Sequence, residues 1–342
     1  MMSSKNNKIY GKIYNEYFIW HESAKGVKEL LQFCFDSFDG ATEPTCFLLI
    51  GDSGLGKSLV AELFHKSYPD YEEDLGDRIN SIKPIVRFSL PSHAKRYEAI
   101  RAFLKAIGDP RWDSSDSFDL KNARLIDYLR DTCKTRMIII DEFHHLTQAM
   151  SSAEIVFTAD WLKLLIKETK IPIVGIGMPW AQRIQSNNQQ MGTIFTMVEE
   201  LFPFKISDED SLEIYCSFLN TLSSRLKKEF SIDAGCLIEP EVLFPLFISS
   251  NGCPKLIMKL IAHASSLSEV RILNVKTFYN LYRFHFGSSK PNPFVPEYKD
   301  MKAVQIESSP DWDKSKKKIV LPNSRELSVR DIFTLGRSAG FF

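Results

Sequence analysis

Short apolar runs along the chain alternate with longer stretches in which apolar residues recur every three or four positions. The runs occupy residues 45–50, 84–89, 137–140 and 171–177. They are rich in β-branched residues and show no polar alternation, which predicts strands buried on both faces. The intervening helical spacing predicts helices that join parallel strands by right-handed crossovers, at 23–38, 57–64, 91–107, 118–133 and 153–169.

The pattern changes after residue 206. Four helical segments follow with no strand between them, at 212–230, 241–249, 254–266 and 275–286. Beyond residue 287 the periodicity fades, and Pro296, Pro310 and Pro322 surround the lysine-rich run 314–318, which predicts an extended tail. We also expect residues 202–206 to form a short fifth strand. The predicted organisation is an N-terminal extension (1–22), an α/β core (23–206), a helical lid (207–286) and a flexible C-terminal tail (287–342).

Composition narrows the class of protein. The chain has 342 residues and is 44% hydrophobic, which is sufficient for a large buried core. Lysine and arginine total 43, as do aspartate and glutamate, so a nucleic-acid surface would have to be a local patch. The six cysteines form no C-x-x-C pair, which favours reduced thiols. No apolar run approaches the roughly 20 residues that cross a bilayer, so we expect a soluble, cytoplasmic protein with no membrane contact.

One loop carries the strongest chemical signal. Directly after the first predicted strand, residues 51–58 match G-x-x-x-x-G-K-[ST], in which glycines let successive backbone N–H groups point at a phosphate. The helix that opens at Lys57 adds the partial positive charge of its N-terminus. We expect Lys57 to reach the β- and γ-phosphates and Ser58 to place its hydroxyl on Mg²⁺. The predicted nucleotide-binding residues of this phosphate loop are Gly51, Asp52, Ser53, Gly54, Leu55, Gly56, Lys57, Ser58 and Leu59.

Two carboxylates end the third predicted strand. Asp141 and Glu142 follow the run 137–140 at the edge where open α/β sheets bind ligands. We expect Asp141 to hold Mg²⁺ through water, and Glu142 to orient and deprotonate the attacking water. An isolated Asp-Glu pair is more often part of a solvated loop. Because this pair follows a phosphate loop, it predicts a site of nucleotide hydrolysis.

Three weaker signals leave alternatives open. Aromatic residues before the phosphate loop, Phe18 and Trp20, either pack on a purine or belong to the core. The adjacent His144 and His145 would point to different faces of a helix, so we do not expect them to share a metal. Three basic residues on the helix 91–107 either bind DNA phosphates or form a solvated face, since Glu98 lies among them; they are Lys95, Arg96 and Arg101.

Together these features resemble the AAA+ ATPases and, among them, the transposition regulators TniB, TnsC and MuB. The resemblance spans roughly residues 18–265 and rests on segments 51–58, 91–110, 140–144 and 171–177. It implies a P-loop NTPase with a parallel sheet flanked by helices and a small helical lid. It also implies ATP and Mg²⁺ as cofactors.

The resemblance further implies partners. The ATP-bound protein would assemble head to tail on double-stranded DNA as a ring or helical filament, receive a TniQ- or TnsD-like target-selection protein, and recruit transposase. We place the contact with a transposase subunit in the tail, where residues 327–335 have apolar positions at helical spacing. The alternative is that residues 320–342 fold back onto the lid.

The chain departs from the family pattern at three places. Ile194-Phe195 stands where an Arg-Phe pair is common, so we consider Arg183 as a substitute arginine finger. Gly177 and Met178 stand where many AAA+ proteins place a polar, water-positioning residue. Lys255 replaces the usual arginine of the sensor helix in the lid. Because an arginine finger alone is worth about 10³–10⁵ in rate, these departures predict slow turnover.

Two other functions fit the same motifs. One is a helicase or initiator loader, and the other is a STAND-like signalling ATPase that does not bind DNA. DNA dependence of assembly separates the DNA-binding candidates from the signalling ATPase. A scaffold that binds ATP without turnover is disfavoured by the intact Glu142.

Overall fold

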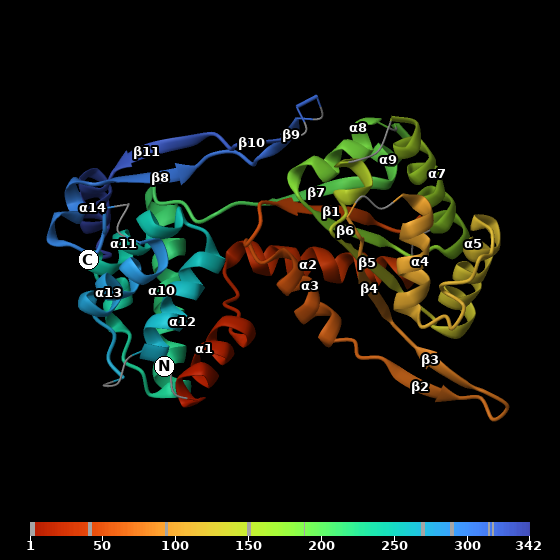
Figure 1. The fold of residues 1–342 in the computed structure, drawn as a ribbon, viewed down its shortest axis with the longest axis horizontal. Coiled ribbons are helices and arrows are strands. Elements are labelled where there is room, and N and C mark those ends of the chain that lie inside the picture. Colours follow the sequence, from red (N-terminus) through yellow and green to blue (C-terminus); the bar gives the residue numbers. More distant parts are fainter. Residues whose placement is uncertain are drawn as a thin grey trace.

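A five-stranded parallel sheet forms the centre of one lobe, with strand order β4-β5-β6-β1-β7 (Figure 1). The strands are β1 (Cys46–Gly51), β4 (Ile85–Ser89), β5 (Met137–Asp141), β6 (Ile173–Gly177) and β7 (Phe195–Leu201). The first four were predicted. The expected fifth strand at 202–206 is wrong, because β7 ends at Leu201 and Pro203 has no N–H to continue the ladder.

The computed structural model describes residues 4–39, 43–92, 95–148, 152–187, 189–267, 271–287, 291–313, 315–316 and 318–342. Two lysines of the run 314–318, Lys314 and Lys317, and the linker residues 288–290 lie outside the described residues.

Helices cover both faces of the sheet because successive strand residues point to opposite sides. Phe47 and Leu49 pack beneath α2 (Glu22–Asp36) and α3 (Lys57–Lys66). Leu48 and Ile50 face the other layer, which is built from α4 (Arg96–Ile107), α5 (Phe118–Asp127) and α7 (Ser152–Thr169). Shorter pieces complete this lobe, namely η1 (Ser37–Asp39), η2 (Tyr128–Thr132), α6 (His145–Gln148), η3 (Pro179–Gln182), α8 (Arg183–Asn187) and α9 (Gln189–Ile194).

A hairpin that the sequence did not predict extends away from this lobe (Figure 1). It pairs β2 (Tyr71–Asp74) with β3 (Ile79–Ile82) in antiparallel register. Its turn includes Gly76 at φ 85°, whose N–H donates to the Asp74 carboxylate. The acidic strand β2 lacks the apolar alternation that would signal a strand, which explains the omission.

The second lobe contains the four helices predicted for the lid, and other segments pack against them. It contains α10 (Glu209–Phe230), α11 (Pro240–Ser250), α12 (Pro254–Leu267) and α13 (Val275–Phe286), with η4 (Gly235–Ile238) between the first two. The N-terminal helix α1 (Ser4–Glu16) packs beside α12, and its Ile13 is buried in the lid core. The N-terminal extension is therefore part of the lid's packing.

The expectation of a flexible C-terminal tail is wrong. The segment forms η5 (Pro296–Asp300), the strand pair β8 (Lys302–Ile306) and β11 (Ser324–Ser328), the pair β9 (Asp311–Asp313) and β10 (Lys318–Val320), and α14 (Val329–Ser338). Tyr298, Val329 and Ile332 are buried in the lid core. Apolar residues are sparse here, but several of them are buried by docking on the lid, whereas Ile319, Val320 and Leu321 stay exposed. Instead, β11 and α14 fold back onto the lid, which is the alternative stated for residues 320–342.

Two sequence expectations concern thiols and membranes. All six cysteines are free, and Cys34, Cys46 and Cys133 are buried. Among the residues that the structure describes, no helix is long and apolar enough to span a bilayer.

Candidate nucleotide site

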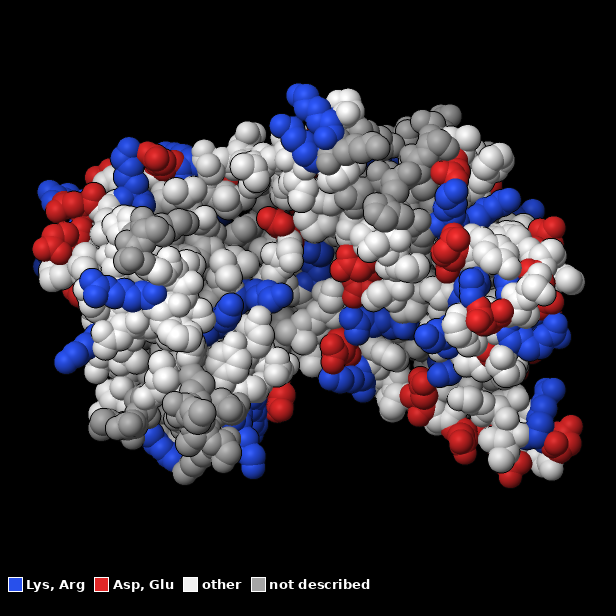
Figure 2. All heavy atoms as spheres, in the orientation of Figure 1, with Lys and Arg blue, Asp and Glu red and all other residues white. Residues whose placement is uncertain are grey.

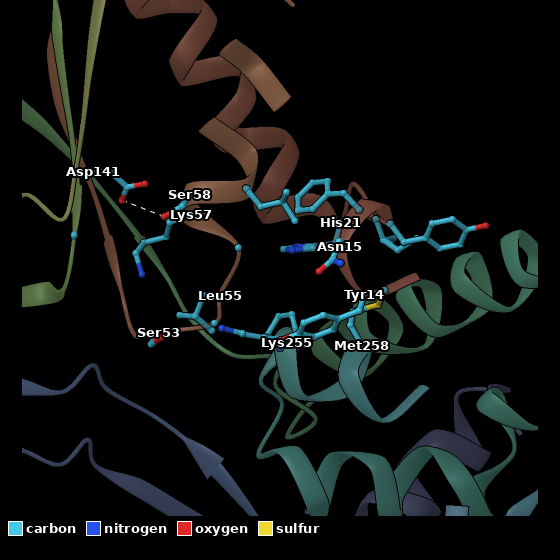
Figure 3. A pocket seen from close by; sticks show the side chains of 18 of the residues that line it. Tyr14, Asn15, His21, Ser53, Leu55, Lys57, Ser58, Asp141, Lys255 and Met258 are labelled. Carbon is cyan, nitrogen blue, oxygen red and sulfur yellow. Dashed lines mark hydrogen bonds between the residues drawn. The ribbon is translucent and has the colours of Figure 1, made fainter. Parts of the chain in front are cut away.

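A cavity of about 620 Å³ lies where the two lobes meet (Figure 3). This volume is within the range of small-molecule sites. Its walls come from six parts of the chain: the N-terminal segment, the phosphate loop, the end of β5 with the turn after it, the end of β6, the helix α10 and the start of α12. The predicted residues that line it are Ser53, Gly54, Leu55, Gly56, Lys57, Ser58, Leu59, Asp141, Glu142 and Lys255.

The phosphate loop has the geometry that its sequence predicts. Gly54 and Gly56 adopt φ 86° and 92°, a backbone region that favours glycine. The buried Lys57 ammonium donates to the carbonyls of Gly51 and Asp52 at 2.8 and 2.7 Å. Those two residues do not line the cavity but orient the lysine. Burial lowers the pKa of Lys57 to about 8, against the opposing effect of nearby carboxylates, so an anionic phosphate would stabilise its charge.

Oxygen ligands suited to Mg²⁺ meet beside this lysine. The Ser58 hydroxyl donates to Asp141 Oδ1 at 3.1 Å, joining the first turn of α3 to the end of β5 (Figure 3). A hydroxyl and a carboxylate in contact are the donor set that Mg²⁺ takes in phosphate loops. Arg87 on β4 donates to the other oxygen, Asp141 Oδ2, also at 3.1 Å. Sequence reasoning missed Arg87, although a charged residue within an otherwise apolar strand was an available signal.

The N-terminal segment forms the end of the cavity away from Asp141. Phe18 lines the cavity, and its ring lies 3.6 Å from where a Cβ on Gly56 would be. Trp20 is 37% exposed and does not line the cavity, so it is not a core residue. His21 also lines the cavity, and burial lowers its pKa to about 4. Phe18 and His21 thus offer a neutral, aromatic surface of the kind that a purine stacks on.

The lid contacts the phosphate loop directly. The backbone N–H of Lys255 donates to the Gly54 carbonyl at 3.2 Å. A Cβ on Gly54 would approach Cys253 Sγ and Lys255 Cβ to about 3.0 and 3.1 Å, so this glycine permits the close approach. The Lys255 side chain lines the cavity.

The two adjacent histidines are arranged differently from our expectation. Nε2 of His144 and Nε2 of His145 lie 3.5 and 3.9 Å from Glu142 Oε2. The reasoning from opposite helix faces was wrong because His144 lies in the turn before α6. One ligand atom from each of the three residues lies within 4.8 Å of the others. The N–H of Met178, however, lies 3.4 Å from His144 Nδ1, which makes Nδ1 the acceptor and leaves the proton on Nε2, where a metal would need a lone pair.

The predicted DNA residues do not line this cavity and are engaged within the chain. Lys95 pairs with Glu154 at 3.4 Å, and Arg101 pairs with Asp113. The Arg96 guanidinium lies over the rings of Phe118 and Phe157. Figure 2 shows basic and acidic side chains interspersed over one face of the molecule. DNA phosphates would have to compete with these contacts.

Arg183 is also engaged. Its guanidinium donates to Asp311 Oδ1 at 2.8 Å and to the Trp312 carbonyl, both in the C-terminal segment. The neighbouring Trp180 packs against Trp312 with ring centroids 6.1 Å apart. The candidate arginine finger is therefore held by the chain's own tail.

Comparisons with known proteins identify the family and the fold. The profile of the family TniB, described as bacterial TniB protein, matches residues 10–205. No curated protein matches. Among solved structures, ORC1 of Aeropyrum pernix in complex with DNA has a TM-score of 0.54 at 14% identity, covering 80% of this chain and 69% of that one. Cdc6p of Pyrobaculum aerophilum has a TM-score of 0.55 at 15% identity, covering 80% and 70%. ORC2 of Aeropyrum pernix, in ADPNP-ADP complexes, has a TM-score of 0.55 at 11% identity, covering 82% and 72%. At these identities the likeness shows the AAA+ fold alone.

Proposed function

The chain belongs to the TniB family of AAA+ proteins associated with transposition, and from this premise we propose that it is an ATP-dependent regulator of transposition. In this proposal it binds double-stranded DNA, assembles head to tail on the target, and links a TniQ- or TnsD-like target-selection protein to the transposase. Slow ATP hydrolysis then dissolves the assembly.

One observation carries the proposal for ATP. Ser58 and Asp141 are 83 positions apart in sequence, yet their oxygens are 3.1 Å apart beside the buried Lys57. This convergence has a clear use if Mg²⁺ and the phosphates of a nucleotide bind there. Bound Mg²⁺ would neutralise charge on the β- and γ-phosphates.

In this proposal each residue of the site has a separate role in binding or hydrolysing ATP. Lys57 contacts phosphate oxygens, and its ammonium exchanges carbonyl partners within its loop for the stronger anionic ones. Glu142, whose side chain is 50% exposed, faces the cavity and accepts the proton of the attacking water. The aromatic surface of Phe18 supports the base, and Lys255 brings the lid to the phosphates.

The proposal also includes the DNA-binding surface and the contact with transposase. We keep Lys95, Arg96 and Arg101 as the DNA-binding residues, and in this proposal phosphates replace their intramolecular partners. We also keep the C-terminal segment as the contact for transposase. Because Val329 and Ile332 are buried, that contact would use exposed residues such as Leu321.

The test measures ATP binding and DNA assembly in three variants. Lys57→Ala should lose ATP binding, whereas Glu142→Gln should keep ATP, stop hydrolysis and accumulate the assembly on DNA. Lys66→Ala is the matched control, because Lys66 lies on the same helix α3 but pairs with Glu62 at the surface. Electron microscopy with ATP, with and without duplex DNA, reports assembly. Equal ATP affinity in wild type and Lys57→Ala would refute the nucleotide site, and assembly that ignores DNA would favour a signalling ATPase.

A further inference from the structure

The turn after β5 places His144 next to Glu142, the proposed catalytic glutamate. Glu142 adopts φ 55°, a left-handed conformation that is uncommon for a residue other than glycine. Two backbone hydrogen bonds fix the turn, from Phe143 N–H to the Ile176 carbonyl and from His145 N–H to the Glu142 carbonyl. As a result, His144 is 7% exposed in its side chain and its Nε2 is directed at Glu142.

Two glycines on the neighbouring strand make room for this turn. A Cβ on Gly175 would lie 2.9 Å from the Phe143 ring, and a Cβ on Gly177 would lie 3.0 Å from the His144 backbone nitrogen and 3.2 Å from Nδ1. Any side chain at Gly177 would therefore press on the backbone and the ring of His144. The ring of His144 occupies the space beside β6 in which a polar side chain of residue 177 would otherwise stand.

The proton on the imidazole can be assigned from its neighbours. The backbone N–H of Met178 points at Nδ1 from 3.4 Å, and a neutral imidazole that accepts at Nδ1 donates at Nε2. Among the described residues, the titratable groups that act on the ring include Lys57, Asp141, Glu142 and His145. Burial lowers the pKa of His144 to about 4, and His145 and Lys57 add to this effect, so the ring is neutral near pH 7.

We propose that His144 positions Glu142 for catalysis by donating its Nε2–H to the glutamate carboxylate while Met178 holds the opposite side of the ring. The 3.5 Å between Nε2 and Oε2 is about half an ångström longer than a usual bond, which a small rotation of the half-exposed glutamate closes. His144 thereby supplies the polar group that Gly177 and Met178 lack. This inference rests on the proposed ATP hydrolysis by Glu142.

Two variants separate positioning from packing. His144→Phe keeps the aromatic volume and the edge contact with Trp180, whose ring centroid is 5.5 Å away, but removes the donor. His144→Gln loses the ring but retains a side-chain acceptor and donor. If His144 positions Glu142, Phe lowers kcat about 100-fold with KM nearly unchanged, and Gln retains more activity than Phe. If His144 only fills space, the order reverses.

A second readout does not depend on activity. In protein labelled with ¹⁵N-histidine and free of nucleotide, the His144 resonance, assigned by its loss in His144→Gln, should report a proton on Nε2. A proton on Nδ1 would overturn the inference, as would full kcat in His144→Phe while Glu142→Gln is inactive. If instead Glu142→Gln hydrolyses ATP as fast as wild type, the proposed function itself fails, which distinguishes the two failures.

Discussion

Replacing Ile332 by alanine tests whether the C-terminal segment is part of the lid. Ile332 is 5% exposed and packs with Leu327 and Val329 in the lid core. Helix α14 lies so close to α10 that a Cβ on Gly336 would come within 3.0 Å of the Leu212 side chain. Truncating a buried isoleucine costs about 2–5 kcal/mol, and we expect the lower half of this range because α14 lies at the surface and can relax.

Urea unfolding followed by circular dichroism measures this cost. With a slope of about 1–3 kcal/mol per molar urea, a loss of about 2–3 kcal/mol moves the midpoint of the lid transition down by roughly 0.7–3 M. Thr334→Ala is the control, since Thr334 is exposed on the same helix and such changes usually stay within about 0.5 kcal/mol. Equal midpoints for Ile332→Ala and Thr334→Ala would show that α14 is not anchored to the lid. That result would favour a flexible C-terminal tail.

Three further predictions address other contacts. The pKa of His21 falls to about 4 in the folded protein, so between pH 6.5 and 4 the unfolded chain binds one more proton than the folded one. As the pH falls through that window the free energy of unfolding should decrease, and it should decrease less in His21→Phe. Unfolding measured at a series of pH values checks this. Asp311→Asn should leave stability nearly unchanged, since an exposed pair contributes about 0–1 kcal/mol, but raise ATP turnover on DNA if Arg183 acts on a neighbouring subunit; unchanged turnover would count against that role. Lys95→Ala with Arg96→Ala should weaken DNA binding and reduce the salt slope by up to about two, and an unaltered slope would exclude this surface.

The sequence predicted those helices and strands whose formation follows from a local pattern of apolar residues. Strands such as β5 and β6 are continuous apolar runs, and helices such as α13, predicted at 275–286, have strong amphipathic spacing and clear ends. The prediction for the C-terminal segment was wrong because its strands gain stability only by pairing with residues distant in sequence, as Leu327 pairs with Ala303. Local pattern does not encode a partner that lies 24 residues away.

The residues of the site likewise fall into those that a local motif predicts and those that only the fold brings together. Lys57, Ser58 and Asp141 were predictable because their spacing reflects the chemistry of phosphate and Mg²⁺. Arg87 and His144 were not, because their roles depend on which strand lies beside which and on the left-handed turn at Glu142. Glycines at 175 and 177 are informative only once the rings that fill their space are seen.

The course of the chain between the lobes sets how the lid can move. It crosses once between α1 and α2 and again after β7, and these crossings touch, since the rings of His21 and Phe204 have centroids 5.4 Å apart. Two adjacent crossings define a hinge with one main axis of rotation. The β9–β10 ribbon makes a third, noncovalent crossing elsewhere, at Trp180 and Arg183 (Figure 1). The ribbon thus adds a noncovalent restraint on rotation about the hinge, and we expect the cavity between the lobes to open more easily when the contacts of Trp180 and Arg183 are released.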